Sequence, residues 1–195
     1  MNLFRPTISK EEIAQLPLAN FEGRIHVIQT LSQAQSAISF LRTQTILGFD
    51  TETRPSFQKG KIHKVALIQL SCEQICFLFR INIIGIPKVL LNLLANPQIK
   101  KVGLSLKDDF HSLNRITNIE QANFIDLQNY VKQFNITENS LSKIFAIIFN
   151  ERISKSQRLS NWEADFLSER QKNYAALDAW AAREIYVKLE ELKQQ

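Results

Sequence analysis

Two kinds of hydrophobic pattern alternate along the chain and predict an alternation of strands and helices. Short apolar runs typical of strands occupy residues 24–29, 46–50, 64–70, 74–79, 101–104 and 124–126. Apolar residues with helical spacing occupy residues 32–42, 86–94, a stretch from about Lys107, 127–134, 140–149 and 168–192. Ser168 followed by Glu169 suits the start of the last helix, and no capping box is expected there.

This order of elements predicts an α/β domain. Strands alternating with helices, plus one hairpin formed by residues 64–70 and 74–79, indicate a mixed central sheet of about five to six strands flanked by helices. The strands are continuously apolar, as is typical of strands buried on both faces. Only five Gly and five Pro occur, too few for an all-β fold with many tight turns. We expect one domain over residues 24–195, preceded by an N-terminal lead of residues 1–23.

Charge and cysteine content narrow the class of protein only slightly. Lys and Arg number 24 against 19 Asp and Glu, so the net charge of +5 suits a polyanionic ligand, although many proteins without one look the same. Cys72 and Cys76 lack the C-x-x-C spacing of a redox or zinc pair, so buried free thiols are expected. The sequence has neither a secretory h-region nor an apolar run of membrane-spanning length. We therefore expect a soluble intracellular protein with no membrane partner, cytoplasmic if bacterial.

The strand at residues 46–50 runs into acidic residues. It continues as ILGFDTE to Glu52, and a charge at the end of a buried strand costs free energy unless something pairs with it. Asp50 and Glu52 are two residues apart, so in a strand their side chains point to the same face. Two converging carboxylates form a seat for a hard divalent cation. A strand end that simply meets solvent would explain the pair equally well.

Two further segments carry candidate acids. Asp108 and Asp109 follow a short strand and open a helix, where the helix dipole also favours acids. Tyr174 and Asp178 are four residues apart in the last predicted helix, so the phenol and the carboxylate share one helix face. The simpler interpretation is that Tyr174 is a core residue and Asp178 a surface acid. Asp178 lies within the apolar run YAALDAWAA, however, which indicates burial and the need for a partner such as a metal ion.

These segments, in this order, resemble the motifs of the DEDD exonuclease superfamily, in its tyrosine-bearing subgroup. They are DTETRPSFQKGKIHKVALIQL at residues 50–70, KKVGLSLKDDFHSL at 100–113 and LSNWEADFLSERQKNYAALDAWAAREIY at 159–186. The intervening FIDLQNY at residues 124–130 resembles the family's F-x-D-L segment. The resemblance spans about residues 24–190, and it is closer to the Werner-syndrome-type exonuclease domain than to ribonuclease D.

The resemblance implies a ribonuclease H-like fold and a metal-dependent 3′-5′ exonuclease that releases nucleoside 5′-monophosphates. The residues carried over as metal-binding or catalytic are Asp50, Glu52, Asp109, Tyr174 and Asp178. The four acids would bind two divalent ions, Mg²⁺ or Mn²⁺, and the tyrosine would hold the attacking water. Asp109 is preferred to Asp108 because it falls at the family's acid when VGL and Leu113 are aligned.

The partner implied is nucleic acid, DNA or RNA, with a free 3′ end. Thr51, Lys61 and Arg158 are the residues expected to contact it. Lys61 is preferred within its loop because its G-K context resembles the family's loop, whereas its basic neighbours are better explained as solvated. Trp162 is expected in the core rather than as a base-stacking platform. The chain has no room for the helicase or helical nucleic-acid-binding domains of many relatives, so distributive trimming is expected.

Several functions share these features. A DNA-directed exonuclease is slightly favoured, with DNA repair as the expected context. Ribonuclease D-like trimming of RNA 3′ ends uses the same fold and acids and is the first alternative. A non-catalytic nucleic-acid-binding module would use the same surface, although the intact acids and tyrosine argue against it. A protein-interaction domain would require three motifs to occur by chance in the right order.

Overall fold

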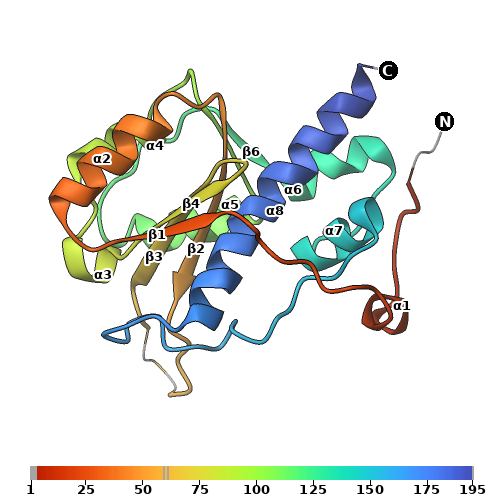
Figure 1. Cartoon of the computed structure of the whole chain (residues 1–195), viewed down its shortest axis with the longest axis horizontal. Coiled ribbons are helices and arrows are strands. Elements are labelled where there is room, and N and C mark those ends of the chain that lie inside the picture. The colour runs from red at the N-terminus through yellow and green to blue at the C-terminus, as the bar shows by residue number, and fades with distance from the viewer. Residues whose placement is uncertain (1–3, 59, 61, 195) are drawn as a thin grey trace.

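A mixed six-stranded sheet with the strand order β1-β4-β3-β2-β5-β6 forms the centre of the computed structural model, which describes residues 4–58, 60 and 62–194 (Figure 1). The strands are β1 (Arg24–Ile28), β2 (Ile46–Thr53), β3 (Val65–Ser71), β4 (Ile75–Phe79), β5 (Lys100–Gly103) and β6 (Phe124–Asp126). β3 runs antiparallel to both of its neighbours, and the other pairings are parallel. The expected α/β class, mixed sheet and 64–79 hairpin are therefore confirmed.

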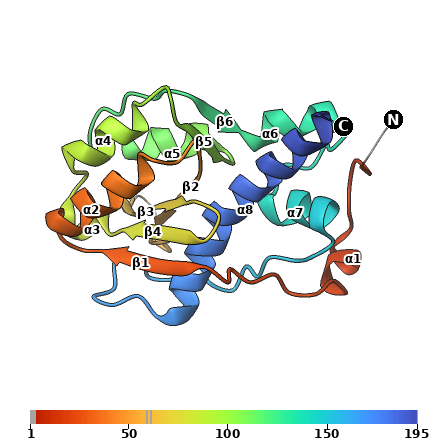
Figure 2. The same cartoon turned by 45° about the horizontal axis from the view of Figure 1, so that its top comes forward.

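Helices cover both faces of this sheet (Figure 2). The long helix α8 (Glu169–Lys193) crosses one face, where it contacts β2, β3, β4 and β5 and packs against α7 (Leu141–Phe149). The opposite face buries apolar residues of α2 (Leu31–Leu41), α4 (Lys88–Leu94) and α5 (Leu106–Leu113) in a separate core cluster. β2 lies between the two layers because Leu47 and Phe49 enter the second cluster while alternate residues face α8. The acidic end of β2 is thereby placed beneath α8.

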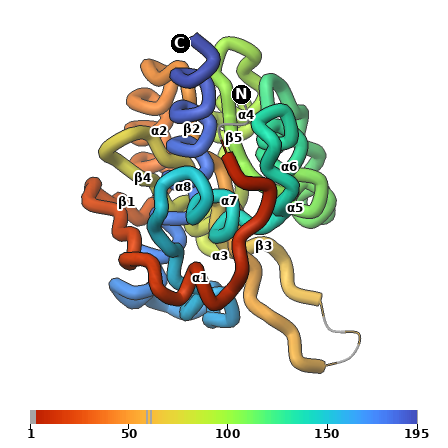
Figure 3. The backbone as a smooth tube through the Cα atoms, turned by 90° about the vertical axis from the view of Figure 1, so that its right-hand side faces the viewer, coloured from red at the N-terminus to blue at the C-terminus, as the bar shows by residue number. Residues whose placement is uncertain are grey.

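The segment before β1 is attached to the rest of the molecule. It contains the short helix α1 (Lys10–Ala14), and Leu18 forms a parallel bridge with Arg152. The backbone N–H of Ala19 donates to the Arg152 carbonyl at 2.9 Å, and the N–H of Arg152 donates to the Pro17 carbonyl at 2.8 Å. These bonds fix α1 beside the segment that connects α7 to α8 (Figure 3).

The remaining differences from expectation concern element ends and short helices. β2 continues to Thr53, so Glu52 lies within the strand rather than after it. The apolar stretch expected as one helix over 127–134 is divided into α6 (Leu127–Tyr130) and the 3₁₀ helix η1 (Val131–Phe134), and α3 (Ile81–Ile84) was not expected. The expectation that α8 lacks a capping box was wrong. The residue three positions after Ser168 is Gln171, and its side chain accepts from the Ser168 N–H at 3.0 Å.

Two further expectations concern cysteine and membranes. Cys72 and Cys76 are both buried and free, as their spacing predicted. In the part of the chain that the structure describes, the helices are too short or too polar to cross a membrane.

Candidate active site

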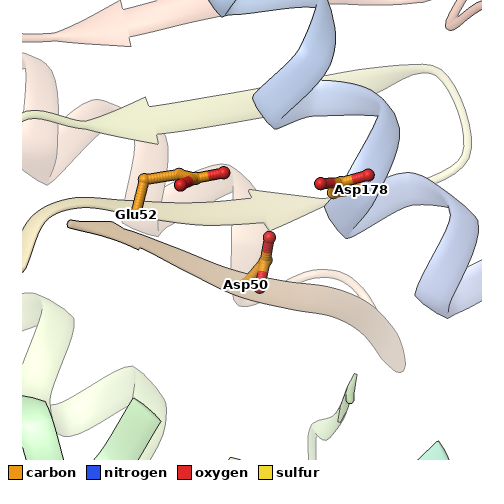
Figure 4. A group of neighbouring side chains, drawn as sticks. All are labelled: Asp50, Glu52 and Asp178. Atoms are coloured by element: carbon orange, nitrogen blue, oxygen red, sulfur yellow. The ribbon is translucent and has the colours of Figure 1, made fainter. Parts of the chain in front are cut away.

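Three carboxylates converge where β2 passes beneath α8. Asp50 and Glu52 project from β2 toward the helix, and Asp178 projects back from α8 (Figure 4). Each offers an oxygen, and these three oxygens lie within 4.8 Å of one another. Glu52 and Asp178 are 9% and 8% exposed, so two of the three acids are buried. The spacing of two in the strand and the position of Asp178 in an apolar run thus bring these residues together as the sequence predicted.

Small residues allow α8 to approach the strand closely enough for this convergence. A Cβ atom built on Gly48 would lie 1.8 Å from the backbone carbonyl oxygen of Ala179. No side chain fits in that space, so glycine at this position lets the helix backbone rest on the sheet. The helix presents Ala175, Ala179 and Ala182 as buried alanines along its length. Gly48 lies two residues before Asp50, and Ala179 directly follows Asp178. The close contact between strand and helix therefore lies next to the acids and sets the distance between them.

Asp109 lies beside this cluster without belonging to the three-oxygen group. It sits in the first turn of α5 and is half-buried, whereas Asp108 is exposed. The hydroxyl of Thr51 donates a hydrogen bond to Asp109 Oδ1. Thr51 was expected to contact nucleic acid, and in the structure its hydroxyl bonds this carboxylate. The negative charge of Asp109 still acts on Asp50, so the fourth acid shares the electrostatic environment of the other three.

The start of α5 is held in place by Asp126, a residue to which the sequence assigned no role beyond the F-x-D-L segment. Its carboxylate accepts hydrogen bonds from the backbone N–H groups of Ser105, at 3.3 Å, and Leu106, at 2.9 Å. These donors belong to the first turn of the helix, which has no intrahelical acceptors for them. Asp126 therefore orients the turn that carries Asp109.

The four acids form no ion pair within the described residues, although the positive charge of Lys155 acts on Asp178. Burial, reinforced by the negative charges of Asp109 and Asp178, raises the pKa of Asp50 well above its ordinary value. Burial, followed by the charge of Asp178, raises the pKa of Glu52 to about 9. Burial raises the pKa of Asp109 and of Asp178 to about 7 each, although hydrogen bonds from Thr51 and Tyr174 act in the opposite direction.

This donor set fits a hard divalent cation. It consists of carboxylate oxygens only, which suit Mg²⁺ or Mn²⁺ better than softer metals. Buried carboxylates that repel one another are stabilised in their charged form by a cation placed among them. The convergence of Asp50, Glu52 and Asp178 offers three oxygens for such a cation, and the charge of Asp109 acts on Asp50 from outside this group.

Tyr174 lies one turn before Asp178 on α8 and is half-buried beside the acids. Burial, followed by the charge of Asp178, raises the pKa of its phenol far above the ordinary value, so the phenol stays protonated at neutral pH. Trp162 packs against it, with 6.1 Å between ring centroids, and its side chain is 0% exposed. Trp162 is therefore a core residue, as expected, and it supports the face of Tyr174.

The loop before α8 carries contacts that the sequence did not reveal. The Glu163 carboxylate accepts a hydrogen bond from Arg54 at 3.3 Å and lies 3.1 Å from His63 Nδ1. Buried Arg80 donates to the carbonyl of Asp165 at 3.1 Å and also bonds that of Ala164. These contacts tie the segment after β2 and the end of β4 to the loop that leads into α8. Nothing in the local sequence distinguishes these residues from solvated charges.

Of the two basic residues expected to contact nucleic acid, the structure describes only Arg158. Lys61 lies outside the described residues. Arg158 is exposed and lines a cavity together with Lys155. Lys155 is the described cation whose positive charge acts on the pKa of Asp178, so this segment approaches the acidic cluster.

Comparison with known proteins agrees with this geometry. A family model described as 3′-5′ exonuclease matches residues 25–193. The chain is 34% identical over 188 residues to the Mus musculus bifunctional 3′-5′ exonuclease/ATP-dependent helicase WRN, and the alignment covers 89% of this chain but 13% of that protein. It is 30% identical over 207 residues to a 3′-5′ exonuclease of Arabidopsis thaliana, covering 95% of this chain and 70% of that one.

A solved structure shows the same fold at lower identity. Escherichia coli RNase D, described as an exoribonuclease involved in structured RNA processing, superimposes with a TM-score of 0.75 and 21% identity. The superposition covers 86% of this chain and 46% of that one. The six-stranded mixed sheet with its flanking helices is thus the ribonuclease H-like fold of that enzyme.

Proposed function

Because this chain belongs to the 3′-5′ exonuclease family, we propose that it removes nucleotides one at a time from a free 3′ end by a two-metal-ion mechanism. Each cleavage would release a nucleoside 5′-monophosphate. The observation that carries the proposal is the convergence of Asp50, Glu52 and Asp178, whose carboxylate oxygens lie within 4.8 Å of one another with no cation paired to them in the described chain.

Two metal positions follow from the placement of the acids. Asp50, Glu52 and Asp178 would hold the first ion, and Asp50 with Asp109 would hold the second. When bound, divalent ions held by these acids would acidify a water and stabilise the charge on the leaving 3′-oxygen. To bind the second ion, Asp109 must offer a carboxylate lone pair that the hydrogen bond from Thr51 does not use. A carboxylate has several lone-pair positions, so it can accept this hydrogen bond and bind a metal ion at the same time.

Tyr174 would orient the attacking water rather than deprotonate it. A phenol whose pKa is raised cannot take up a proton at neutral pH, but it can both donate and accept a hydrogen bond. Tyr174 lies one helical turn from Asp178 on α8, and a hydrogen bond between the two side chains supports this role. Trp162 behind the ring limits the directions in which the phenol can move.

Tyr174→Phe is therefore expected to lower kcat by about ten- to a hundredfold while leaving KM nearly unchanged, because the variant lacks a positioned hydrogen bond at the reacting water. The pH dependence of kcat should keep its shape, since the tyrosine does not titrate in the working range. Steady-state kinetics from pH 6 to 9 measure both. A variant that loses the acidic limb of the profile would instead make Tyr174 a proton acceptor.

DNA is the slightly favoured substrate. This preference follows the resemblance of the motifs to the Werner-syndrome-type exonuclease domain, and the chain is 34% identical to the WRN protein. Trimming of RNA 3′ ends, like that of ribonuclease D, is the alternative, because the acids and fold do not distinguish the sugars. Discrimination rests on contacts to the 2′-hydroxyl.

The test is a gel assay on 5′-labelled single-stranded DNA, single-stranded RNA and 3′-recessed duplex, each with Mg²⁺, Mn²⁺ or EDTA. A ladder that shortens from the 3′ end, disappears in EDTA and is absent for Asp50→Ala supports the proposed function. The relative rates rank the substrates. Binding without cleavage on every substrate and metal would replace the proposal with a non-catalytic binding module.

Metal removal is also expected to change the pH dependence of stability. Carboxyls whose pKa is raised on folding, here about 7 for Asp109 and Asp178 and about 9 for Glu52, bind more protons in the folded than in the unfolded state between pH 5 and 9. The metal-free protein therefore loses stability as pH rises through this range. A loss of about 2 kcal/mol lowers Tm by roughly 4–8 °C in a chain of this size.

Thermal denaturation in EDTA at pH 5.5, 7 and 8.5 measures this loss. Mn²⁺ or Mg²⁺ at about 100 times its Kd should restore about 2.7 kcal/mol at the higher pH values. Because other groups titrate as well, the informative quantity is the difference between the wild type and Asp178→Asn. If the difference in Tm between the two proteins does not grow with pH, the charged acids do not destabilise the metal-free fold.

A further inference from the structure

A basic cleft lies beside the catalytic centre, on the side of the N-terminal segment. It is a cavity of 660 Å³ between α1, the start of α7 and residues 152–159. The cations that line it are Lys10, Lys143, Arg152, Lys155 and Arg158. Lys143 is paired with Glu138. Within the described chain, Lys10, Lys155 and Arg158 are exposed and form no ion pair.

A second cavity adjoins this basic cleft and reaches Tyr174. This second cavity, of 470 Å³, is lined by Tyr174 and Arg170 of α8 and by residues of the segment before β1. Ser154 and Ser156 line both cavities, so the two share a wall. A nucleic-acid strand that occupied both cavities would contact Tyr174 and Arg170 in one and the basic cleft in the other.

α1 contributes lining residues to this cleft although it lies outside the residues that the family model matches. The match covers residues 25–193, whereas Lys10, Ile13 and Ala14 belong to α1. The bridge between Leu18 and Arg152 holds this segment in place. Lys10 thus lines the same cavity as Arg158 as part of the fold and not as part of a free tail.

We propose that this basic cleft binds the sugar-phosphate backbone of the single strand upstream of the 3′ end, and that α1 is an accessory nucleic-acid-binding element. The proposal rests on the exonuclease function proposed above. Unpaired cations from two segments that line one cavity suit a repeating row of phosphates, which Lys and Arg contact without reading sequence. Ile13, Ala14 and the 60%-exposed Leu159 give the same cleft an apolar surface for sugars and bases.

The test compares Lys10→Glu/Arg158→Glu with Arg42→Glu/Lys88→Glu, a control that makes the same charge change at exposed residues on the opposite layer of helices. Two substrates are used: the p-nitrophenyl ester of thymidine 5′-monophosphate, which reaches only the catalytic centre, and a 5′-labelled oligo(dT) long enough to enter the cleft. The variant in the cleft should hydrolyse the ester like wild type and degrade oligo(dT) with a KM raised at least about tenfold. The control should match wild type on both.

Binding of oligo(dT) to an Asp50→Asn background at several salt concentrations gives a second measurement. Lys10→Gln/Arg158→Gln should reduce the slope of log Kobs against log salt by about 1.4, or about 0.7 for each phosphate that is no longer neutralised. Circular dichroism melting confirms that each variant is folded, and the Gln pair replaces the Glu pair if the latter unfolds. Unchanged KM and slope in a folded variant would overturn the cleft proposal, leaving an acidic protein partner for this surface. Failure of wild type to hydrolyse either substrate would overturn the exonuclease function instead.

Discussion

Asp178→Asn is expected to lower kcat/KM by at least about a thousandfold while making the metal-free protein more stable. Asparagine has nearly the same shape but cannot carry the negative charge that a divalent ion requires, and loss of a metal-centred step removes several kcal/mol of transition-state stabilisation. Without metal the same change relieves the repulsion among buried carboxyls that raises the pKa of Asp50 and Glu52. Activity and metal-free stability should therefore move in opposite directions.

The matched control for this substitution is Asp108→Asn. Asp108 is exposed and adjacent to Asp109, so the same chemical change outside the cluster should leave kcat/KM within about twofold and Tm nearly unchanged. Exonuclease rates with Mn²⁺ and melting curves in EDTA at pH 8 give both quantities. If Asp178→Asn kept its activity, the three-carboxylate site would not be the catalytic centre. If it lost both activity and stability, Asp178 would be a structural residue.

Local rules made most of the site's acids candidates, and the resemblance to the exonuclease family selected them together with Asp109. The spacing of Asp50 and Glu52 fixes a common strand face, and the spacing of Tyr174 and Asp178 fixes a common helix face. The alternation of elements predicted the mixed sheet, and the resemblance implied that the faces would meet. Three of the four acids do converge in the structure.

The contacts that hold these acids could not be predicted because they join residues far apart in the chain. Asp126 caps the turn that carries Asp109, and Arg80 from the end of β4 bonds the loop before α8. Each partner has an ordinary sequence context, and only the folded chain brings it to its acceptor. Lys10 is similar, since its place in the basic cleft follows from the Leu18–Arg152 bridge and not from a motif.

The close contact between Gly48 and the backbone of α8 is required both by the fold and by the candidate active site. In the sequence Gly48 is one apolar-strand glycine among five glycines, with no feature that marks it. In the structure it is the point where the α8 backbone rests on β2, and a Cβ there would lie 1.8 Å from the Ala179 carbonyl oxygen. The neighbour is backbone, so a rotamer change cannot relieve the clash, and the helix must move away from the strand.

Gly48→Ala is therefore expected to cost about 3 kcal/mol or more in stability and to lower Tm by roughly 6–12 °C. Displacement of α8 also moves Asp178 and Tyr174 relative to Asp50, and a misplacement of about 1 Å in a catalytic group costs about a hundredfold in rate. We expect kcat/KM to fall by at least about that factor at a temperature well below the Tm of the variant. Thermal denaturation and steady-state hydrolysis of oligo(dT) measure the two effects.

Ser71→Ala separates this effect from a general disturbance of the sheet. Ser71 pairs with Gly48 across β2 and β3 and is fully buried, but the change only removes a hydroxyl that bonds the Cys72 carbonyl. It should cost about 1 kcal/mol and leave kcat/KM unchanged, because no backbone is displaced. If Gly48→Ala lowered stability but kept full activity, α8 could shift without moving Asp178 from its partners, and the site would tolerate a looser contact than the geometry indicates. Equal losses of activity in both variants would point to sheet integrity, and not helix placement, as the property that the site requires.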